Sequence, residues 1–540
     1  MSATRSRRTG TAGSSWGPVK TALARLPGAL EAALTIKHAL RPPPRGAFPG
    51  RAFHSWLRDL PGSLPPPDRR ILLFACRDNW LRFSLATAVV LLARRCRVDF
   101  AYLPYTRVDR EESLLDAKEF RFYYGRFLDD RCHPYLRFLD LTGFAASPAS
   151  PEMAAEADRQ SLLDTRWLLQ REELDLDGNR AHREAYEFRR RRNLDCMSRV
   201  VSLLERHPCD GMLLAHGNLR ELGAAFRAAR LLGRRAVTFD FKERAEALVL
   251  SGDGPVCHMD TSREWAADAP HTLGPEGRER VGDLMARRLE AKWKGFSWSH
   301  QYTGFTGDRD AVLGRLHLPG GGPMVLLCPN VAWDSSLQGR DRAFPSLAEW
   351  IRHTVRFFAA RPDTRLVVRA HPSETMFGTA QPVAGMVREC FPQLPANLRI
   401  VDSQELINTY DLMDLCDLGL VYNSTTGLEF ALRGLPVVVA GRPHYGEKGF
   451  TIDVDTRDQY DAAMEGLLAA PGSRLSDRQV ELAWCYADVF FFRWHHPFPW
   501  CMATFWQDME RWPLRRVLSE EGERRFGPTL DLLVGRPYSN

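Results

Sequence analysis

The chain has 540 residues, enough for about two to four domains of the usual size. Hydrophobic residues make up 44% and charged residues 26%, a globular composition that excludes disorder of the whole chain. Lys and Arg exceed Asp and Glu by only 73 to 67. The net charge of +6 suits an anionic small molecule or a membrane surface and gives no reason to expect nucleic acid. The 11 cysteines are scattered without a C-x-x-C pair, which disfavours a disulfide framework and structural zinc.

Residues 1–65 are predicted to form a basic, partly disordered leader. Its start, MSATRSRRTGTAGSSW, has no apolar core of the kind that a secretory signal needs. Helical spacing of apolar residues at 19–40 favours a helix that packs on its own protein over an interfacial helix on a membrane. The longest apolar run, at 85–93, is too short to span a bilayer. We therefore expect a cytoplasmic protein, free in solution or peripheral to the inner face of the membrane.

An alternation of strands and helices predicts an N-terminal Rossmann-like domain at 66–317. Short apolar runs at 71–75 and 97–103 flank a helical stretch, which is typical of a parallel βαβ unit. A second unit of this kind spans 211–241, where GMLLA and RAVTFDF flank an amphipathic helix. Between the two units, four consecutive arginines at 189–192 favour the solvated face of a helix.

The segment LPGGGP at 318–323 is the best interdomain linker, because its glycines and prolines do not fit inside a helix or strand. A second α/β series follows and predicts a C-terminal Rossmann-like domain at 318–475. Residues 476–540 are predicted to be helices that pack back on the domains. The fold class is therefore α/β, with two Rossmann-like domains facing a cleft. This is the GT-B arrangement, in which ligands bind at the carboxyl ends of the strands.

Two loops of the second domain follow predicted strands and carry polar side chains. The first contains Arg369, His371 and Pro372, and its cationic donors suit phosphate oxygens. Packing of the histidine against its own domain is the alternative. The second begins a helix and offers an anion site at the positive end of the helix dipole, or simple capping. Its candidate residues are Asn423, Ser424, Thr425, Thr426 and Glu429. Gly427 is expected to let a ligand approach the backbone.

A third loop combines glycine hinges with Tyr445, Lys448 and Thr451, more than a purely structural loop usually needs. A further loop, with Asn330 and Asp334, follows the first strand of this domain and is a donor-side candidate. No D-x-D pair follows a predicted strand convincingly, so a metal-dependent mechanism is disfavoured. The charge of a bound phosphate is instead expected to be met by cationic side chains and helix dipoles.

The catalytic group is expected in the first domain. His216 follows a buried strand and has a side chain suited to taking a proton from an acceptor hydroxyl, with Gly217 leaving room beside it. Asp240 ends the next strand and is the second choice, as a base or nucleophile. Each residue could instead cap a helix or pack internally. Asp78 and Asn79, after the first strand, are candidate acceptor contacts.

The order of these motifs resembles the capsule polysaccharide biosynthesis proteins, the group that includes the bacterial β-Kdo transferases. The motifs are R-x-H-P, then N-S-T-T-G-x-E-x-A-L-x-G-x-P-V-V, then G-x-P-x-Y-x-x-x-G-x-T, within 324–455. The resemblance implies that the H-P pair and the Ser/Thr pair hold the phosphate and cytidine of a donor, a role that falls on His371, Pro372, Ser424 and Thr425. His444 stands where relatives often have an aromatic residue.

The resemblance implies a GT-B glycosyltransferase of surface or capsular polysaccharide biosynthesis. A nucleotide-activated sugar, with CMP-Kdo as a candidate, would bind the C-terminal domain, and a glycan or lipid-linked glycan acceptor would bind the N-terminal domain. No cofactor beyond this donor and no metal is implied. The alternatives are a CDP-polyol phosphotransferase, a nucleotide-sugar epimerase of the same fold, and a non-catalytic assembly subunit.

Overall fold

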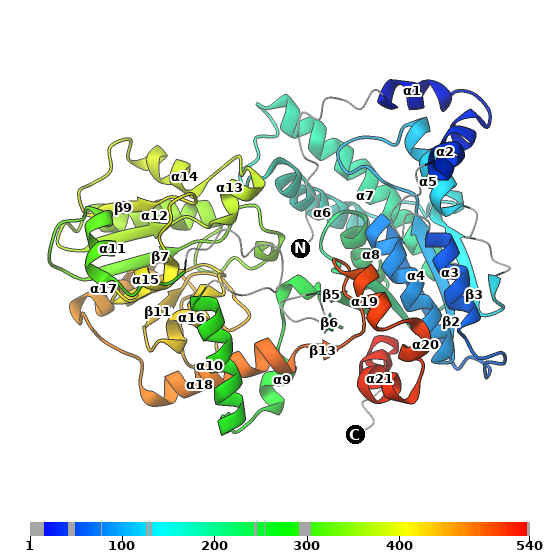
Figure 1. The fold of residues 1–540 in the computed structure, drawn as a ribbon. Helices are drawn as coiled ribbons and strands as arrows, with labels where there is room; N and C mark the ends of the chain where they lie inside the picture. Colours follow the sequence, from blue (N-terminus) through cyan, green and yellow to red (C-terminus); the bar gives the residue numbers. More distant parts are fainter. Residues whose placement is uncertain are drawn as a thin grey trace. The chain divides into compact units, whose positions relative to one another are not determined.

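The structure is a computed structural model, and it describes residues 16–40, 49–76, 78–125, 128, 132–241, 246–252, 254–290 and 304–536 (Figure 1). The chain divides into two compact units. The first unit consists of the described parts of Met1–Asp164, Arg183–Cys257 and His496–Asn540. The second unit consists of those of Thr165–His182 and His258–His495.

The first unit is built on a seven-stranded sheet in the order β13-β6-β5-β4-β1-β2-β3. Strands β1 to β5 run parallel, whereas β6 is antiparallel to β5, and β13 is antiparallel to β6. The strands are β1 (Arg69–Cys76), β2 (Cys96–Leu103), β3 (Leu136–Asp140), β4 (Gly211–Ala215), β5 (Ala236–Asp240), β6 (Ala247–Ser251) and β13 (His496–Pro497). The parallel strands lie in the doubly wound order 5-4-1-2-3, which reverses between β1 and β4.

Helices precede, connect and follow these strands. They are α1 (Trp16–Leu23), α2 (Ala29–Leu40), α3 (Pro49–Arg58), α4 (Asp78–Ala93), α5 (Leu114–Tyr124), α6 (Pro151–Leu169), α7 (Arg180–Arg206), α8 (Arg220–Leu231), α19 (Phe505–Arg511), α20 (Leu514–Val517) and α21 (Glu520–Val534). The last residues of α6, 165–169, and the first residues of α7, 180–182, belong to the second unit. Helix α4 is buried over almost all of 81–92 and packs on β1 and β2, as a crossover helix between buried parallel strands does.

The second unit has a six-stranded, fully parallel sheet in the order β12-β11-β10-β7-β8-β9. The strands are β7 (Met324–Cys328), β8 (Arg365–Arg369), β9 (Leu398–Val401), β10 (Leu418–Val421), β11 (Val437–Val439) and β12 (Ile452–Asp453). The strand order reverses between β7 and β10. Ligands bind at such a reversal in open α/β sheets, outside the carboxyl ends of the strands.

The helices of the second unit cover this sheet. They are α9 (Ser262–Ala267), α10 (Pro275–Leu289), α11 (Arg309–Leu316), α12 (Leu347–Ala359), α13 (Ser373–Phe377), α14 (Val383–Cys390), α15 (Thr409–Met413), α16 (Thr426–Leu432), α17 (Arg457–Ala469) and α18 (Asp477–Asp488). Helices α12 and α14 pack side by side, and so do α16 and α18 (Figure 1). Trp350 and Ile351 of α12 are completely buried in the core that includes β7 and β8.

The α/β class with two Rossmann-like sheets is confirmed. Sequence reasoning could identify the sheets because a strand buried on both faces is a short, continuous apolar run. The proposed cleft between the two domains stays a prediction.

The border between the units differs from the predicted domain border at 318–323. Residues 258–317 belong to the second unit, as does 165–182. Polar contacts explain this: Arg288 of α10 is ion-paired with Glu429 of α16, and Asp411 accepts hydrogen bonds from the backbone of Thr306 and Gly307. Residues 496–540 return to the first unit, where β13 extends its sheet. Which segments pack on which unit depends on tertiary contacts, and the sequence patterns of strands and helices do not reveal those contacts.

The described part of 1–65 is more ordered than the predicted leader. Helices α1 to α3 bury apolar side chains against the first unit. The Phe53 ring lies 5.8 Å from that of Phe138, and the Trp56 ring 6.0 Å from that of Phe505. Predicted disorder at 1–15 and 41–48 falls outside the described residues. The described helices are packing elements, so a chain truncated before residue 68 would expose apolar surface.

Leu34→Ala is expected to lower the free energy of unfolding by about 2 kcal/mol, the lower end for buried leucine, because its cluster is small. Ile36 lies on the same helix but is 59% exposed, so Ile36→Ala is expected to cost about 0.5 kcal/mol or less. Urea unfolding of both variants tests this. Equal, small effects in both variants would mean that these helices contribute little to the stability of the first unit.

The arginine run at 189–192 differs from the predicted solvated face. Arg189 is 1% exposed and Arg192 is 5% exposed, because α7 turns both toward buried acidic groups and an aromatic ring. Arg191 lies on the outer face. Among the helices in the described part of the chain, none has a stretch long and apolar enough to cross a membrane.

Candidate functional site

The candidate site of the second unit lies where its strand order reverses. The loops after β7 and β10 meet there, since the backbone N–H of Asn423 donates to the side-chain oxygen of Asn330 at 3.0 Å. The next strand along the sheet, β8, ends at Arg369 and leads into His371. Three neighbouring strands therefore deliver polar residues to one edge of the sheet, as the sequence predicted.

Asn423 carries the most informative side chain at this edge. It is 8% exposed, and neither its Oδ1 nor its Nδ2 has a hydrogen-bond partner among the described residues. A Cβ at Gly441 would lie 2.5 Å from the Asn423 Oδ1, so the loop after β11 closes tightly over this amide. Buried amides are rarely left unsatisfied, because the loss costs about 1–3 kcal/mol. The donor and the acceptor of this amide therefore remain to be satisfied by a bound water or a ligand.

His371 is held as a neutral imidazole. Burial lowers its pKa to about 4, and Arg369 acts in the same direction while Asp334 opposes it. The His371 Nδ1 accepts a hydrogen bond from the backbone N–H of Ser373 at 3.1 Å. The ring proton therefore lies on Nε2, which leaves a neutral donor. Such a donor can bind a phosphate or sugar oxygen without adding charge.

Arg369 is 6% exposed, and its guanidinium donates to the backbone oxygen of Asp402, directly after β9, at 2.7 Å. Sequence reasoning missed Asp402, because the adjacency of β8 and β9 cannot be read from one sequence. Pro372 follows His371 and precedes the short helix α13. The buried Glu374 in that helix accepts from the backbone N–H of Val383, and burial raises its pKa to about 7.

The Ser/Thr segment after β10 forms a turn that satisfies itself in part. The Ser424 hydroxyl donates to that of Thr426 at 2.8 Å and accepts from the Thr426 backbone N–H at 3.3 Å. Ser424, Thr425 and Thr426 are half-buried. Thr425, the N-cap residue of α16, makes no side-chain cap hydrogen bond, so Ser424 closes a local turn before the helix. Binding of an anion by this segment stays a prediction.

Two residues expected in the donor site instead point into the protein. Tyr445 is fully buried and its hydroxyl donates to the Ser424 backbone oxygen. A Cβ at Gly427 would lie 2.1 Å from that hydroxyl, so the space beside Gly427 holds Tyr445 and leaves none for a ligand. Glu429 is paired with Arg288 and accepts from the Tyr410 hydroxyl at 3.0 Å. Both residues hold the loop in place, because the Tyr445 ring is buried and the Glu429 carboxylate is ion-paired inside the unit.

The rest of the third loop is arranged around Asp453. The Thr451 hydroxyl donates to this carboxylate at 2.6 Å, and the Glu447 backbone N–H donates to it at 3.0 Å. Lys448 is half-buried, and burial lowers its pKa against the opposing effect of Asp260 and other acidic groups. Thr451 thus has an internal role, whereas Lys448 remains a candidate cation.

In the first unit, His216 lies at the reversal of strand order between β1 and β4. Its backbone N–H donates to the Phe239 oxygen at 2.8 Å, and its ring meets that of Trp80 edge-on at 5.7 Å. A Cβ at Gly217 would lie 2.5 Å from the Thr238 side chain, so the room expected there is occupied.

Asp240 ends β5 and is 7% exposed. Its carboxylate accepts from the Phe241 backbone N–H at 2.8 Å. His216 is half-buried and thus more accessible than Asp240. The side chains of Asp78 and Asn79, at the start of α4, lie outside the part of the chain that is described, so their acceptor role stays a prediction.

Residues 289–468, one third of the chain, match the family described as capsule polysaccharide biosynthesis protein. The resemblance predicted from the three motifs is confirmed for this segment. No curated protein matches the chain.

Solved structures similar to this one include two β-Kdo transferases of Thermosulfurimonas dismutans. The 2,7-transferase has a TM-score of 0.31 and 15% identity, with coverage of 54% of this chain and 79% of that one. For the 2,4-transferase these values are 0.34, 16%, 52% and 80%. An α,α-trehalose 6-phosphate synthase from Burkholderia multivorans has a TM-score of 0.30 and 14% identity over 82% of this chain and 98% of that one. Likenesses this distant carry no argument about residues or substrates.

Proposed function

We propose that this chain, whose residues 289–468 match the capsule polysaccharide biosynthesis family, is a glycosyltransferase of surface or capsular polysaccharide assembly. It transfers a sugar from a nucleotide-activated donor to a glycan or glycolipid acceptor. The observation that carries the proposal is the buried, unpartnered amide of Asn423 at the reversal of strand order, within the matched segment. CMP-Kdo is the first donor to test.

The donor is proposed to bind at the carboxyl ends of β7, β8 and β10. The Asn423 amide would pair with a donor and an acceptor of the nucleotide, and the His371 Nε2–H would donate to an oxygen of its phosphate. Such preset donors stabilise the negative charge that grows on the leaving phosphate. Arg369, at the end of β8 and two residues before His371, adds positive charge near it, so the proposed reaction needs no metal ion.

In the transfer step, the acceptor hydroxyl oxygen bonds to the anomeric carbon of the sugar. The bond from that carbon to the phosphate oxygen breaks, and the nucleotide leaves with the electron pair. The acceptor proton passes to a base, for which His216 of the first unit is proposed. Placement of the two substrates supplies a large part of the rate.

His371→Ala is expected to weaken nucleotide binding at least about 10-fold, since a hydrogen bond to a charged group contributes about 1.5–3 kcal/mol. Thermal shift with CMP, CDP and UDP identifies the nucleotide, and calorimetry then measures its affinity. The matched control is His317→Asn, since His317 is exposed at the left-handed end of α11, a conformation that asparagine tolerates. Unchanged affinity in His371→Ala would remove His371 from the donor site.

Product analysis with the identified donor separates the remaining alternatives. A glycosyltransferase releases the nucleotide and leaves no new phosphate in the acceptor. A phosphotransferase would leave phosphate in its product, and an epimerase would need no acceptor. A chain that binds the nucleotide and turns over none of these substrates would be an assembly subunit.

A further inference from the structure

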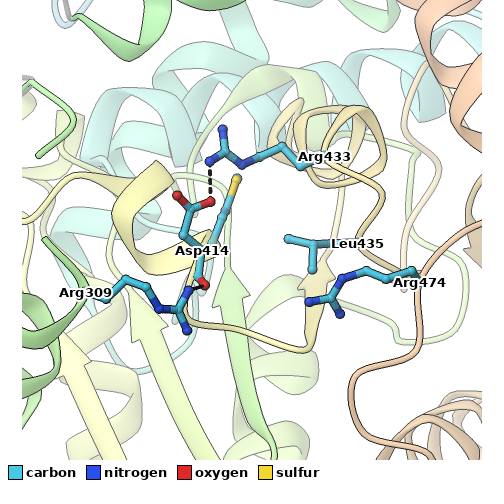
Figure 2. Close-up of a pocket in the computed structure, with 6 residues that line it drawn as sticks. Arg309, Asp414, Arg433, Leu435 and Arg474 are labelled. Atoms are coloured by element: carbon cyan, nitrogen blue, oxygen red, sulfur yellow. Dashed lines mark hydrogen bonds and ion pairs between the residues drawn. The ribbon is translucent and has the colours of Figure 1, made fainter. Parts of the chain in front are cut away.

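A polar pocket lies in the same unit, at the edge of the sheet opposite to Asn423. Its volume is about 360 Å³, and it is lined by Arg309, Met413, Asp414, Arg433, Leu435 and Arg474 (Figure 2). Asp414 precedes β10, and Arg433 and Leu435 precede β11, so these residues lie at the amino ends of the strands. The pocket is therefore separate from the candidate donor site at the carboxyl ends.

The pocket has an excess of positive charge. Three arginines face a single carboxylate, that of Asp414, which is ion-paired with Arg433. Arg309 donates to the backbone oxygen of Asp414, and Arg474 donates to that of Ser473 at 3.0 Å. Neither is ion-paired with a carboxylate of the described residues. Two guanidinium charges at one small pocket repel each other, and an anion between them would remove that cost.

Of the three arginines, Arg433 is held in place by its surroundings. The Arg433 guanidinium lies 5.7 Å from the centre of the Tyr410 ring and 5.9 Å from that of Phe305, in addition to its ion pair. Next to Arg474, the Leu475 backbone N–H donates to the Gly434 oxygen at 2.9 Å, which ties this segment to the loop before β11. A guanidinium group that is already positioned, as that of Arg433 is, loses little freedom when it binds an anion.

We propose that this pocket binds a phosphate group, as an anion site distinct from the donor site. Guanidinium forks match phosphate oxygens in pairs, and the volume is at the small end for ligand pockets. Met413 and Leu435 line the pocket beside the charges, and both side chains are buried. A soluble phosphorylated molecule and the phosphate of an anionic lipid present the same chemistry to these arginines. The experiment distinguishes the two sources.

The methyl group of Met413 provides a local probe in the full-length chain. Methionine methyl NMR is recorded while pyrophosphate is added at constant ionic strength, and the Met413 signal is identified by Met413→Leu. We expect a saturable shift of Met413 and none of Met464, which is buried in the core of the same unit. The Arg309→Gln/Arg474→Gln double variant is expected to weaken binding at least about 10-fold. Both side chains are exposed, so the fold should be unaffected.

His371→Ala separates this site from the proposed donor site, because it should leave the Met413 response unchanged even if the proposed function is wrong. A parallel titration uses vesicles of phosphatidylglycerol, with phosphatidylcholine as control. A response to pyrophosphate identifies a soluble ligand, and a response to phosphatidylglycerol alone identifies a lipid headgroup. No response of Met413 to either, or an equal response in the double arginine variant, would overturn the proposal.

Discussion

Replacing His216 with alanine is expected to lower turnover by about 10²–10⁴-fold, the usual loss when a general base is removed. His216 stands at the reversal of strand order in the first sheet, half-buried and beside the Trp80 ring. The residues proposed to bind the donor belong to the second sheet. Nucleotide affinity should therefore stay close to that of the wild type. Calorimetry and a turnover assay on the same preparation measure the two effects separately.

Asp240→Asn is the matched comparison, because Asp240 ends the neighbouring strand. Its carboxylate is buried and accepts from the Phe241 backbone. We expect this variant to keep most of its turnover. An inactive Asp240→Asn beside a fully active His216→Ala would make the carboxylate the catalytic group and favour a carboxylate base or a covalent route. Full activity in both variants would contradict the placement of the base in these two loops.

The second large effect concerns stability. Arg189→Met is expected to lower the free energy of unfolding of the first unit by about 3–5 kcal/mol, because it leaves the buried carboxylate of Asp164 without its cation and that of Glu221 with Arg192 alone. Arg189 is ion-paired with Asp164 at 3.2 Å and with Glu221 at 3.1 Å, and all three side chains are almost fully buried. Its guanidinium also donates to the Asn193 side chain at 2.9 Å.

Arg191→Met is the control for this experiment, since Arg191 is two positions along the same helix and 64% exposed. It should change the free energy by about 0.5 kcal/mol or less. Urea unfolding followed by a probe in the first unit compares the two variants. A loss in Arg189→Met no larger than that of the control would mean that Asp164 and Glu221 do not depend on this arginine.

The sheets could be predicted from the sequence because buried parallel strands are continuous apolar runs separated by helices. The loops after them could be chosen as a site for the same reason, since the carboxyl ends of parallel strands lie at one edge. The units' borders could not be predicted. Glu172 accepts from the backbone N–H groups of Leu347 and Ala348, 175 and 176 positions away, and no local pattern announces such a partner.

The same limit applied within the site. His371 and Asn423 could be chosen as candidates from the sequence, because each lies two residues after the end of a strand. Tyr445 and Glu429 were chosen for their chemistry, but both are satisfied by neighbours inside the unit. The type of a polar residue in a loop indicates which chemistry its side chain can perform. The direction of that side chain depends on the packing around it.

The unpaired amide of Asn423 has a consequence for the evolution of this protein. Without ligand, the chain carries the cost of two buried polar atoms, about 1–3 kcal/mol for each unsatisfied group. A leucine of similar shape would avoid that cost, so selection for heat resistance alone would favour replacement of the asparagine by leucine. Under the proposed function, an asparagine at this position trades stability of the unliganded protein for donor binding. Thermostable variants selected without substrate should be inspected at this position first.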